Sequence, residues 1–228
     1  IKYACKILST NTPPCHVVGL NNEDDMAHVK KIADCMINKT VISFDSMLSK
    51  SIHMAEIKVD NSTNISKIIR DTLSQFDFED CFSAIKDSLG QLINELLYNA
   101  LFNAPTDKDG NQTFKEQDRK VNIRLDIKNS ADLKITNNEK EICISVVDKY
   151  GSITKDVIDS HISRSKVTEK KGGAGIGLSL IYNNSHELIF IVSPGEKTEV
   201  ISVIHKYKRY KNNMKHVRSF HFFVKGKQ

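Results

Sequence analysis

The sequence predicts an α+β fold in which helices cover one face of a mixed, mostly antiparallel sheet. Apolar, β-branched runs alternate irregularly with amphipathic helical segments. A "PGEK" turn joins two apolar runs, which is typical of an antiparallel hairpin. The 228 residues and 39% hydrophobic content suit one large globular domain, or one domain with a fragment of another. We therefore expect a two-layer α/β sandwich.

Residues 1–50 are predicted to be a fragment of an upstream α/β domain. A short strand and a "TPP" turn lead to a strand around "CHVVGL" and a helix across "DDMAHVKKIADCMINK". This segment is too small to build a core of its own. Its last part, "VISFDSML", resembles the end of a degenerate receiver domain.

A second unit is predicted from residue 54 to residue 228. It begins with a strand at "AEIKV" and a helix at "NSTNISKIIRDTL", for which Ser62, Thr63 or Asn64 is the candidate N-cap. A long helix is expected from 81 to 103, and a long polar loop, "APTDKDGNQTFKEQDR", follows it. The apolar face of the long helix comprises Ile85, Leu89, Leu92, Ile93, Leu96 and Ala100.

The rest of the second unit is predicted to be mainly strands. These are expected at 120–128, 132–136 and 141–148. A polar, lysine-rich segment with one short helical piece then leads to a helix at about 175–183. The runs "HELIFIVS" and "TEVISVIHKY" form the hairpin, and "SFHFFVK" is the last strand.

Composition narrows the functional class. Five cysteines at wide spacing, without a C-x-x-C pair, argue against a disulfide framework or a zinc site and indicate a reducing, cytoplasmic compartment. No apolar run approaches the roughly 18 residues of a membrane span, so no membrane partner is expected.

The net charge of +5 is concentrated in the basic C-terminal segment 205–228. No acidic residue follows Glu199. Such a segment can contact nucleic acid, an anionic membrane or an acidic protein, and a solvated hairpin is the plainer interpretation. Nucleic acid is not the expected partner, because the segment lacks the interleaved stacking aromatics of single-strand binders.

A glycine cluster precedes the helix predicted at 175–183, in the stretch "EKKGGAGIGLSLI". Leu178 stands where a dinucleotide-binding fingerprint needs its last glycine and where a P-loop needs lysine, so neither motif fits. The remaining string, Gly173-Ala-Gly175-Ile-Gly177-Leu178, can present backbone amides to a phosphate at a helix N-terminus. Taken alone, it is equally consistent with a turn.

Two further features carry polar side chains that suit a binding site. Glu95 and Asn99 lie four residues apart on the long helix, at the rim of its apolar face. Asp148 ends an apolar strand next to Gly151, where its carboxylate can accept a hydrogen bond from an exocyclic amine or cap a turn.

In this combination and order, residues 54–228 resemble the GHKL ATPase superfamily, which includes gyrase-type ATPases, Hsp90 chaperones, histidine-kinase catalytic domains and anti-sigma-factor serine kinases. The N box is similar to "NELLYNALFNA", the second glycine box to "GGAGIGLSLI" and the threonine strand to "PGEKTEV". The first glycine box departs from the family's D-x-G-x-G pattern. Here Tyr150 and Ser152 replace both of its glycines and Gly151 lies between them.

The resemblance implies a Bergerat ATP-binding fold with ATP and Mg²⁺ as cofactors. Asn99 would be the Mg²⁺ ligand, Glu95 the general base, and Asp148 the acceptor for the adenine amine. Thr198 would lie near the phosphates. The other nucleotide-binding residues it implies are Asn103, Gly151, Lys171, Gly173, Gly175, Gly177 and Leu178. A cation for the γ-phosphate would come from Arg164, Lys166, Lys170 or Lys171.

Among family members, the short segment between the glycine boxes is most similar to the anti-sigma-factor serine kinases. The sequence contains no helix with a phosphoacceptor His followed by an acid, since the His186-Glu187 pair follows the glycine cluster. We expect a signalling ATPase domain that phosphorylates Ser or Thr of a partner protein, with a homodimer as a further arrangement. The alternatives are a histidine-kinase catalytic domain acting on a His outside this chain, a non-catalytic nucleotide-gated module, and a nucleic-acid binder.

Overall fold

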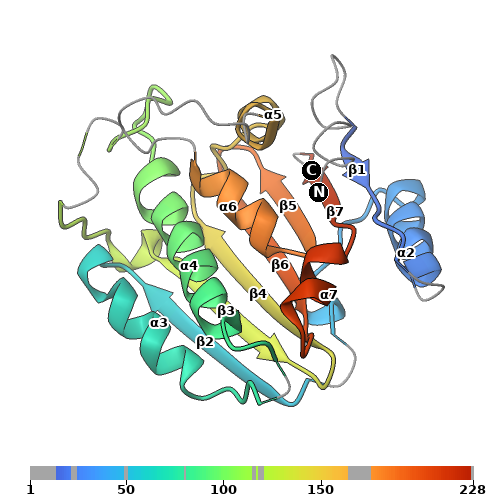
Figure 1. Cartoon of the computed structure of the whole chain (residues 1–228). Helices are drawn as coiled ribbons and strands as arrows, with labels where there is room; N and C mark the ends of the chain where they lie inside the picture. Colours follow the sequence, from blue (N-terminus) through green and yellow to red (C-terminus); the bar gives the residue numbers. More distant parts are fainter. Residues whose placement is uncertain are drawn as a thin grey trace.

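The computed structural model describes residues 14–21, 25–48, 51–79, 81–114, 117, 121–163 and 176–226. Within them, a seven-stranded sheet runs in the order β1-β7-β5-β6-β4-β3-β2, with helices packed on it (Figure 1). All neighbouring strands are antiparallel except β5 and β7, which are parallel. The predicted α+β fold with a mixed, mostly antiparallel sheet is therefore confirmed.

The strands correspond closely to the apolar runs of the sequence. Their bounds are β1 His16–Val17, β2 His53–Val59, β3 Ala131–Asn137, β4 Glu141–Asp148, β5 Glu187–Ser193, β6 Lys197–His205 and β7 Ser219–Val224. β5 and β6 form the predicted hairpin, and β4 pairs with β6 over its whole length. β4 and β5 are almost continuously buried because both faces of the sheet are covered at its centre.

The helices are α2 Asp25–Ile37, α3 Ile65–Leu73, α4 Ile85–Tyr98, α5 Lys155–Ser163, α6 Ile176–Asn184 and α7 Tyr210–Lys215. Short 3₁₀ turns occur at Phe44–Ser46, Ser62–Asn64 and Ile127–Asn129. A π-helical turn, Asn99–Asn103, continues α4.

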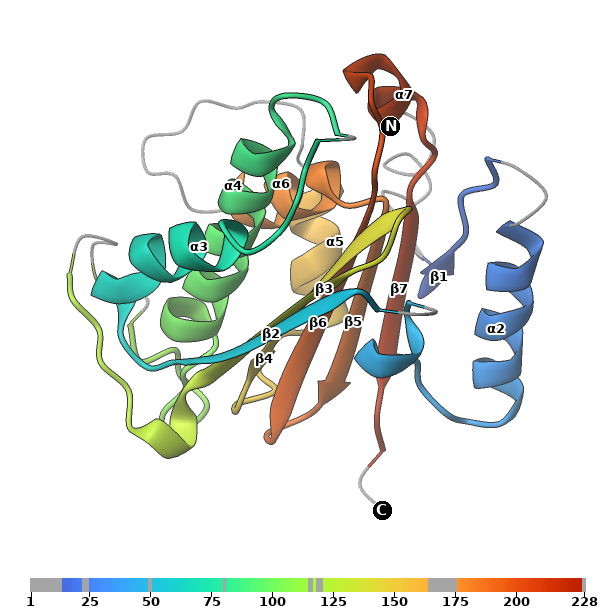
Figure 2. The ribbon, with the colours of Figure 1, turned by 90° about the horizontal axis from the view of Figure 1, so that it is seen from below.

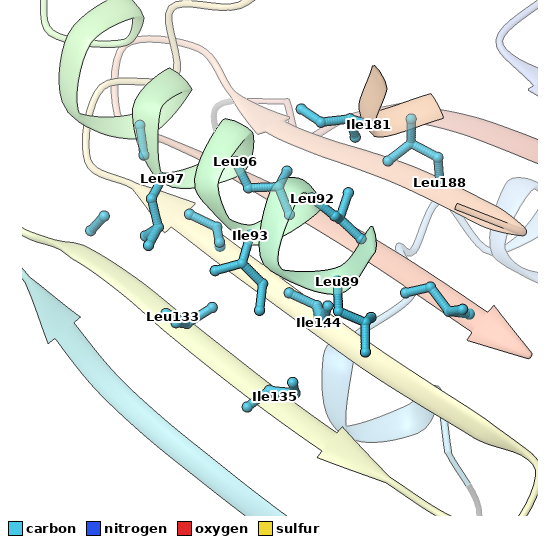
Figure 3. Close-up of a cluster of buried hydrophobic side chains, with 14 of the residues drawn as sticks. Leu89, Leu92, Ile93, Leu96, Leu97, Leu133, Ile135, Ile144, Ile181 and Leu188 are labelled. Atoms are coloured by element: carbon cyan, nitrogen blue, oxygen red, sulfur yellow. The ribbon is translucent and has the colours of Figure 1, made fainter. Parts of the chain in front are cut away.

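The larger core lies between α4 and the sheet (Figure 3). Leu92, Ile93 and Leu97 of α4 are fully buried against Leu133 of β3 and Ile144 of β4. This is the apolar face that the 3.6-residue period predicted. α3 and α6 both pack against α4, so α4 is held by two helices as well as by the sheet.

A second, smaller core covers the opposite face of the sheet, and Figure 2 shows α2 on that side. Ile32 of α2 and Phe44 pack with Ile189, Ile201 and Phe223 of the sheet. β1 pairs with β7 in the same sheet. The described part of the predicted upstream fragment therefore contributes a strand to this sheet and covers part of its second face.

Two local predictions need correction, and a third concerns residues that the structure does not describe. The strand predicted at 120–128 is wrong: between 121 and 128 the structure has a single bridge, Arg124 with Asn61, and the start of a 3₁₀ turn. This segment instead hydrogen-bonds to the loop after β2, where Leu125 N donates to Asp60 O. The long helix starts at residue 85 instead of 81. The short strand predicted at the beginning of the chain lies outside the described residues.

The predicted cap of the helix at "NSTNISKIIRDTL" is only partly right. Asn64 does precede α3, but its side chain makes no capping hydrogen bond. The side-chain cap lies one turn earlier, where Asn61 Oδ1 accepts from the backbone N of Thr63, 3.0 Å away. A 3₁₀ turn thus starts the segment before α3 itself begins.

Candidate functional site

The C-terminal end of α4 carries the predicted Glu95, Asn99 and Asn103, each four residues apart. Asn103 Nδ2 donates to Asn99 Oδ1 at 2.7 Å. The Ala104 N–H donates to the Asn99 carbonyl at 2.8 Å, which is the i→i+5 bond of a π turn. Single π turns inside or at the end of α-helices are frequent at functional sites. This turn links the Asn99 and Asn103 side chains where α4 ends.

Asp148 is buried at the end of β4. Its Oδ1 accepts hydrogen bonds from the backbone N–H groups of Tyr150, at 2.8 Å, and Gly151, at 3.1 Å. Burial raises the pKa of the Asp148 carboxyl above its ordinary range, and the two amide hydrogen bonds partly oppose that rise. The turn after β4 thus holds one oxygen of this buried carboxylate.

Thr198 is the cross-strand partner of Asp148 in the β4–β6 pair. Its side chain is 2% exposed, and its hydroxyl oxygen has no hydrogen-bond partner among the described residues. Both the hydroxyl and the backbone N–H of Thr198 lie close enough to the Asp148 carboxylate to favour its ionised form and so lower its pKa. Buried polar atoms are normally satisfied, and this hydroxyl and carboxylate can both exchange hydrogen bonds with a ligand.

The turn after Asp148 is fixed against the β5–β6 turn. Gly151 has φ +60°, a conformation that side-chain-bearing residues rarely adopt. A Cβ at this position would lie 2.1 Å from the carbonyl oxygen of Ser193, and the Gly195 N–H donates to the Gly151 carbonyl at 3.3 Å. Glycine is therefore required between Tyr150 and Ser152, although the two expected glycine positions on either side are filled.

Ser152 joins this turn to the end of α4. Its hydroxyl donates to the carbonyl of Ala104, 2.9 Å away, one residue after the π turn. The residues predicted on α4 and those predicted after β4 therefore lie at the same end of the sandwich (Figure 1). Sequence reasoning noted Ser152 only as a departure from a glycine pattern and did not predict this link.

α6 runs antiparallel to α4. Its C-terminal residues Asn183 and Asn184 lie beside Ile85 and Ser88 in the first turn of α4. The nine residues of α6 advance about 12 Å, which brings its N-terminal end level with the turn of α4 that contains Glu95. The predicted phosphate-binding end of α6 and the predicted base therefore face the same region.

The structure describes only part of the second glycine box. Gly177 is buried in the first turn of α6, and Leu178 packs against the larger core. The remaining predicted residues of this box and the candidate cations lie outside the described residues: Arg164, Lys166, Lys170, Lys171, Gly173 and Gly175.

The predicted Mg²⁺ ligand, Asn99, offers an oxygen donor. Within the described ranges, no three His, Cys, Asp or Glu side chains are grouped as a metal site. The amide oxygen of Asn99 is a hard ligand, which suits a Mg²⁺ shared with a phosphate rather than a site built from protein ligands alone.

The chain matches no protein-family model and no curated protein sequence. Among the described helices, none is long and apolar enough to cross a membrane.

Proposed function

We propose that this chain binds ATP with Mg²⁺ at the end of the sandwich where α4, β4 and β6 meet, and transfers the γ-phosphate to a Ser or Thr hydroxyl of a partner protein. The observation that carries the proposal is the Asp148–Thr198 pair. A desolvated carboxylate, one oxygen of which is held by the turn after β4, lies beside the buried Thr198 hydroxyl, which makes no hydrogen bond of ordinary geometry within the described residues.

These two groups suit the edge of an adenine ring. The Asp148 carboxylate can accept a hydrogen bond from an exocyclic amine, and the Thr198 hydroxyl can donate one to a ring nitrogen. The register of β4 and β6 makes them neighbours, so we assign Thr198 to the base instead of the phosphates. Hydrogen bonds made to a base here would replace those the two groups lose on burial.

The phosphates would extend toward α4 and the N-terminus of α6. That helix end offers backbone amides to an anion, and Gly177 leaves its first turn without a side chain. Asn99 would hold Mg²⁺ through its side-chain oxygen, and Asn103 fixes the orientation of that amide. Mg²⁺, when bound, neutralises phosphate charge.

Glu95 is the residue we assign as general base. The acceptor hydroxyl oxygen bonds to the γ-phosphorus, the bond from that phosphorus to the bridging oxygen breaks to release ADP, and the hydroxyl proton passes to the Glu95 carboxylate. We place this activity in the cytoplasm, which is consistent with the free thiols of Cys15, Cys35 and Cys143.

A non-catalytic, nucleotide-gated binding module is the second candidate. One observation favours it: the serine that replaces a family glycine is tied to α4 through the Ser152–Ala104 hydrogen bond, and Tyr150 adds a half-buried ring to the same turn. A turn restrained in this way holds the base site in one conformation. Turnover distinguishes the two candidates, because both require ATP binding.

Calorimetric titration of ATP into the chain, with and without Mg²⁺, tests the nucleotide site. Asn99→Ala is expected to remove the Mg²⁺ dependence, and Thr198→Val to weaken binding about tenfold by deleting one hydroxyl without changing shape. Asn212→Ala, an exposed helical asparagine remote from the site, is the matched control. No binding of wild type at millimolar ATP would refute the nucleotide site.

Glu95→Ala then tests catalysis. We expect the variant to bind ATP as wild type does while ADP release falls by about 10²–10⁴. Equal ADP release by the two proteins would remove Glu95 as the base. If neither protein releases ADP but both bind ATP, the binding-module candidate holds.

A further inference from the structure

A shallow hollow lies at the end of the sandwich opposite the candidate nucleotide site. It is formed by the first turn of α4, the last turn of α6, the end of β6 and α7, and has a volume of about 50 Å³. Figure 1 shows α7 beside the lower ends of α4 and α6. We call it the α7 hollow, with the apolar lining residues Phe82, Ile85, Leu89, Ile204, Tyr210 and Met214.

α7 turns one face toward this hollow. Tyr210, Asn213 and Met214 have the i, i+3, i+4 spacing of one helix face, and all three line the hollow. Tyr210 is 56% exposed and Met214 is 41% exposed, although Tyr210 also contacts Phe82 with ring centroids 5.4 Å apart. Large apolar side chains left half in water beside a hollow mark an interaction surface rather than a finished core.

The α7 side of the hollow is positively charged. Lys211 and Lys215 each follow a hollow-lining residue by one position, so both lie about 100° around the helix from it and form one rim. Both are exposed, as is Arg209 before α7, and no acidic residue occurs after Glu199 in the chain. The hollow, which is lined by amide and hydroxyl groups as well as apolar side chains, therefore has a basic border on its α7 side.

Two further features make the surroundings of the hollow more positive: the Arg218 guanidinium and the N-terminus of α4. Arg218, which is buried, donates from Nη2 to the Asn183 carbonyl at the C-terminal turn of α6 and offsets the negative end of that helix. The first turn of α4 has no side-chain cap at Ala84, so its positive end is not neutralised by a capping oxygen. Asp87 lies on the far side of α4 from the hollow, about 160–200° from Ile85 and Leu89.

Acidic residues also act on this part of the surface. Asp77 and Glu79 are exposed in the segment that precedes α4, and Asp25 interacts electrostatically with Tyr207 and His216, which flank α7. The lysines lie on α7 itself. Acidic groups of an occupant are therefore expected against α7.

We propose that the α7 hollow binds an acidic, amphipathic segment of a partner protein. A large apolar side chain of that segment enters the hollow against Tyr210 and Met214, and neighbouring carboxylates pair with Arg209, Lys211 and Lys215. The inference does not rest on the nucleotide site, which lies at the other end of α4. At protein interfaces, a few buried anchor side chains commonly supply most of the binding free energy, and polar or charged residues surround them.

A selection of displayed random peptides on the full chain tests this proposal without assuming a partner. Peptides that bind wild type but not Lys211→Glu/Lys215→Glu are collected and sequenced. We expect them to combine Asp or Glu with a large apolar residue. Fluorescence anisotropy of an enriched peptide should show affinity at least tenfold weaker, or about 1.4 kcal/mol, for the charge-reversed pair.

Matched controls separate the hollow from net charge. Lys30→Glu/Lys128→Glu changes the net charge equally at exposed positions elsewhere and should leave affinity unchanged. Met214→Ser should weaken the peptide several-fold, whereas Met36→Ser, at an exposed methionine of α2, should not. Lys211→Gln/Lys215→Gln should be intermediate, and circular dichroism checks that every variant is folded.

Three results would overturn the proposal. Enriched peptides that are neutral or basic would remove the charge argument. Acidic peptides that bind all variants alike would place the contact elsewhere. Lysine-dependent binding of single-stranded DNA or of phosphatidylserine vesicles, with no acidic peptide enriched, would assign the same rim to a nucleic acid or a membrane surface.

Discussion

At the scale of single residues, Gly151 is the position in the candidate site where the backbone conformation and its close neighbours most strongly require glycine. Gly151→Ala adds a Cβ 2.1 Å from the Ser193 carbonyl oxygen at a φ of +60°. We expect the free energy of unfolding to fall by about 3 kcal/mol or more, measured by urea titration. Gly110→Ala is the matched control, because Gly110 also has positive φ but no atom near its added Cβ, so only about 1–2 kcal/mol of backbone strain is expected. Equal losses in the two variants would contradict this reading of the turn.

Asp148 shows how a buried carboxylate lowers stability at neutral pH. Its pKa is raised by burial, so the folded state favours the protonated form. Its contribution to stability is therefore present below the unfolded-state pKa and is lost as pH rises through the folded-state pKa. Asp148→Asn removes the buried charge and keeps an oxygen for the amides of Tyr150 and Gly151.

We therefore expect Asp148→Asn to be more stable than wild type at pH 7.5, with the difference narrowing toward pH 4, and to bind ATP more weakly. Urea unfolding at several pH values measures the first effect and calorimetry the second. A variant less stable than wild type at pH 7.5 would show that the ionised carboxylate is already compensated within the protein.

At the scale of elements, buried histidines connect several elements. His28 and His221 link α2 with β7, and a second group contains His186 and His216. His28 Nε2 of α2 lies 3.0 Å from His221 Nε2 of β7, and His28 Nδ1 lies 3.5 Å from Glu187 of β5. Burial lowers the pKa of His221 and His186 to about 2 and that of His216 to about 4, while burial raises the pKa of Glu187 to about 7. These groups fold in their neutral forms.

The signs of these shifts give a pH dependence. Each histidine contributes stability that is present above its unfolded-state pKa near 6.5 and is lost as pH falls toward the folded value. Glu187 acts oppositely, because its contribution is present below its unfolded-state pKa and is lost as pH rises toward 7. Between pH 4.5 and 6.5 the three histidines outweigh one glutamate, so stability should rise with pH, by on the order of 1 kcal/mol per pH unit for each net proton.

His221→Gln should reduce the slope of unfolding free energy against pH between pH 4.5 and 6.5 by the contribution of about one proton, on the order of 1 kcal/mol per pH unit. Unfolding free energies from urea titrations across this range measure the slope. His53→Gln, at an exposed histidine of β2, should leave it as in wild type. An unchanged slope in His221→Gln would show that His221 titrates alike in the folded and unfolded states.

The elements that the sequence predicted well are those whose pattern is local. The β5–β6 hairpin, β4 and the apolar face of α4 follow from periodicity and one turn. The strand predicted at 120–128 is wrong because this segment hydrogen-bonds to the loop after β2 instead of to a neighbouring strand. A run of β-prone residues does not specify its pairing partner. The π turn at Asn99 was not predicted, since one extra residue in a helical turn leaves the polar spacing nearly unchanged.

At the candidate site, the sequence singled out Asp148, Thr198, Glu95 and Asn99 through their order and their resemblance to a family pattern. What it did not supply was their arrangement. Asp148 and Thr198 are neighbours only because of the β4–β6 register, and Ser152 reaches Ala104 only because the end of β4 and the end of α4 meet. Register and tertiary contacts depend on the whole sheet.

At the scale of the whole molecule, the N-terminal part of the chain is joined to the sheet that carries the site. Ile32, Ile42, Phe44 and Leu48 are buried on the face opposite α4, and β1 extends the sheet beside β7. Each of these side chains is worth about 1.5–3 kcal/mol when buried. The sequence predicted a boundary after residue 50, so the independence of the segment that follows is open to a direct test.

A chain that begins at Ser51 would expose Ile189, Ile201 and Phe223 on that face. We expect it to aggregate or to unfold at lower urea concentrations than the full chain, as measured by size-exclusion chromatography and urea titration.

In the full chain, Phe44→Ala should lower the free energy of unfolding by about 3–5 kcal/mol, and Met36→Ala, an exposed control, should leave it nearly unchanged. A monomeric truncated chain with full stability would instead support an independent domain after residue 50, because the contacts of α2 would then contribute nothing to the sheet's stability.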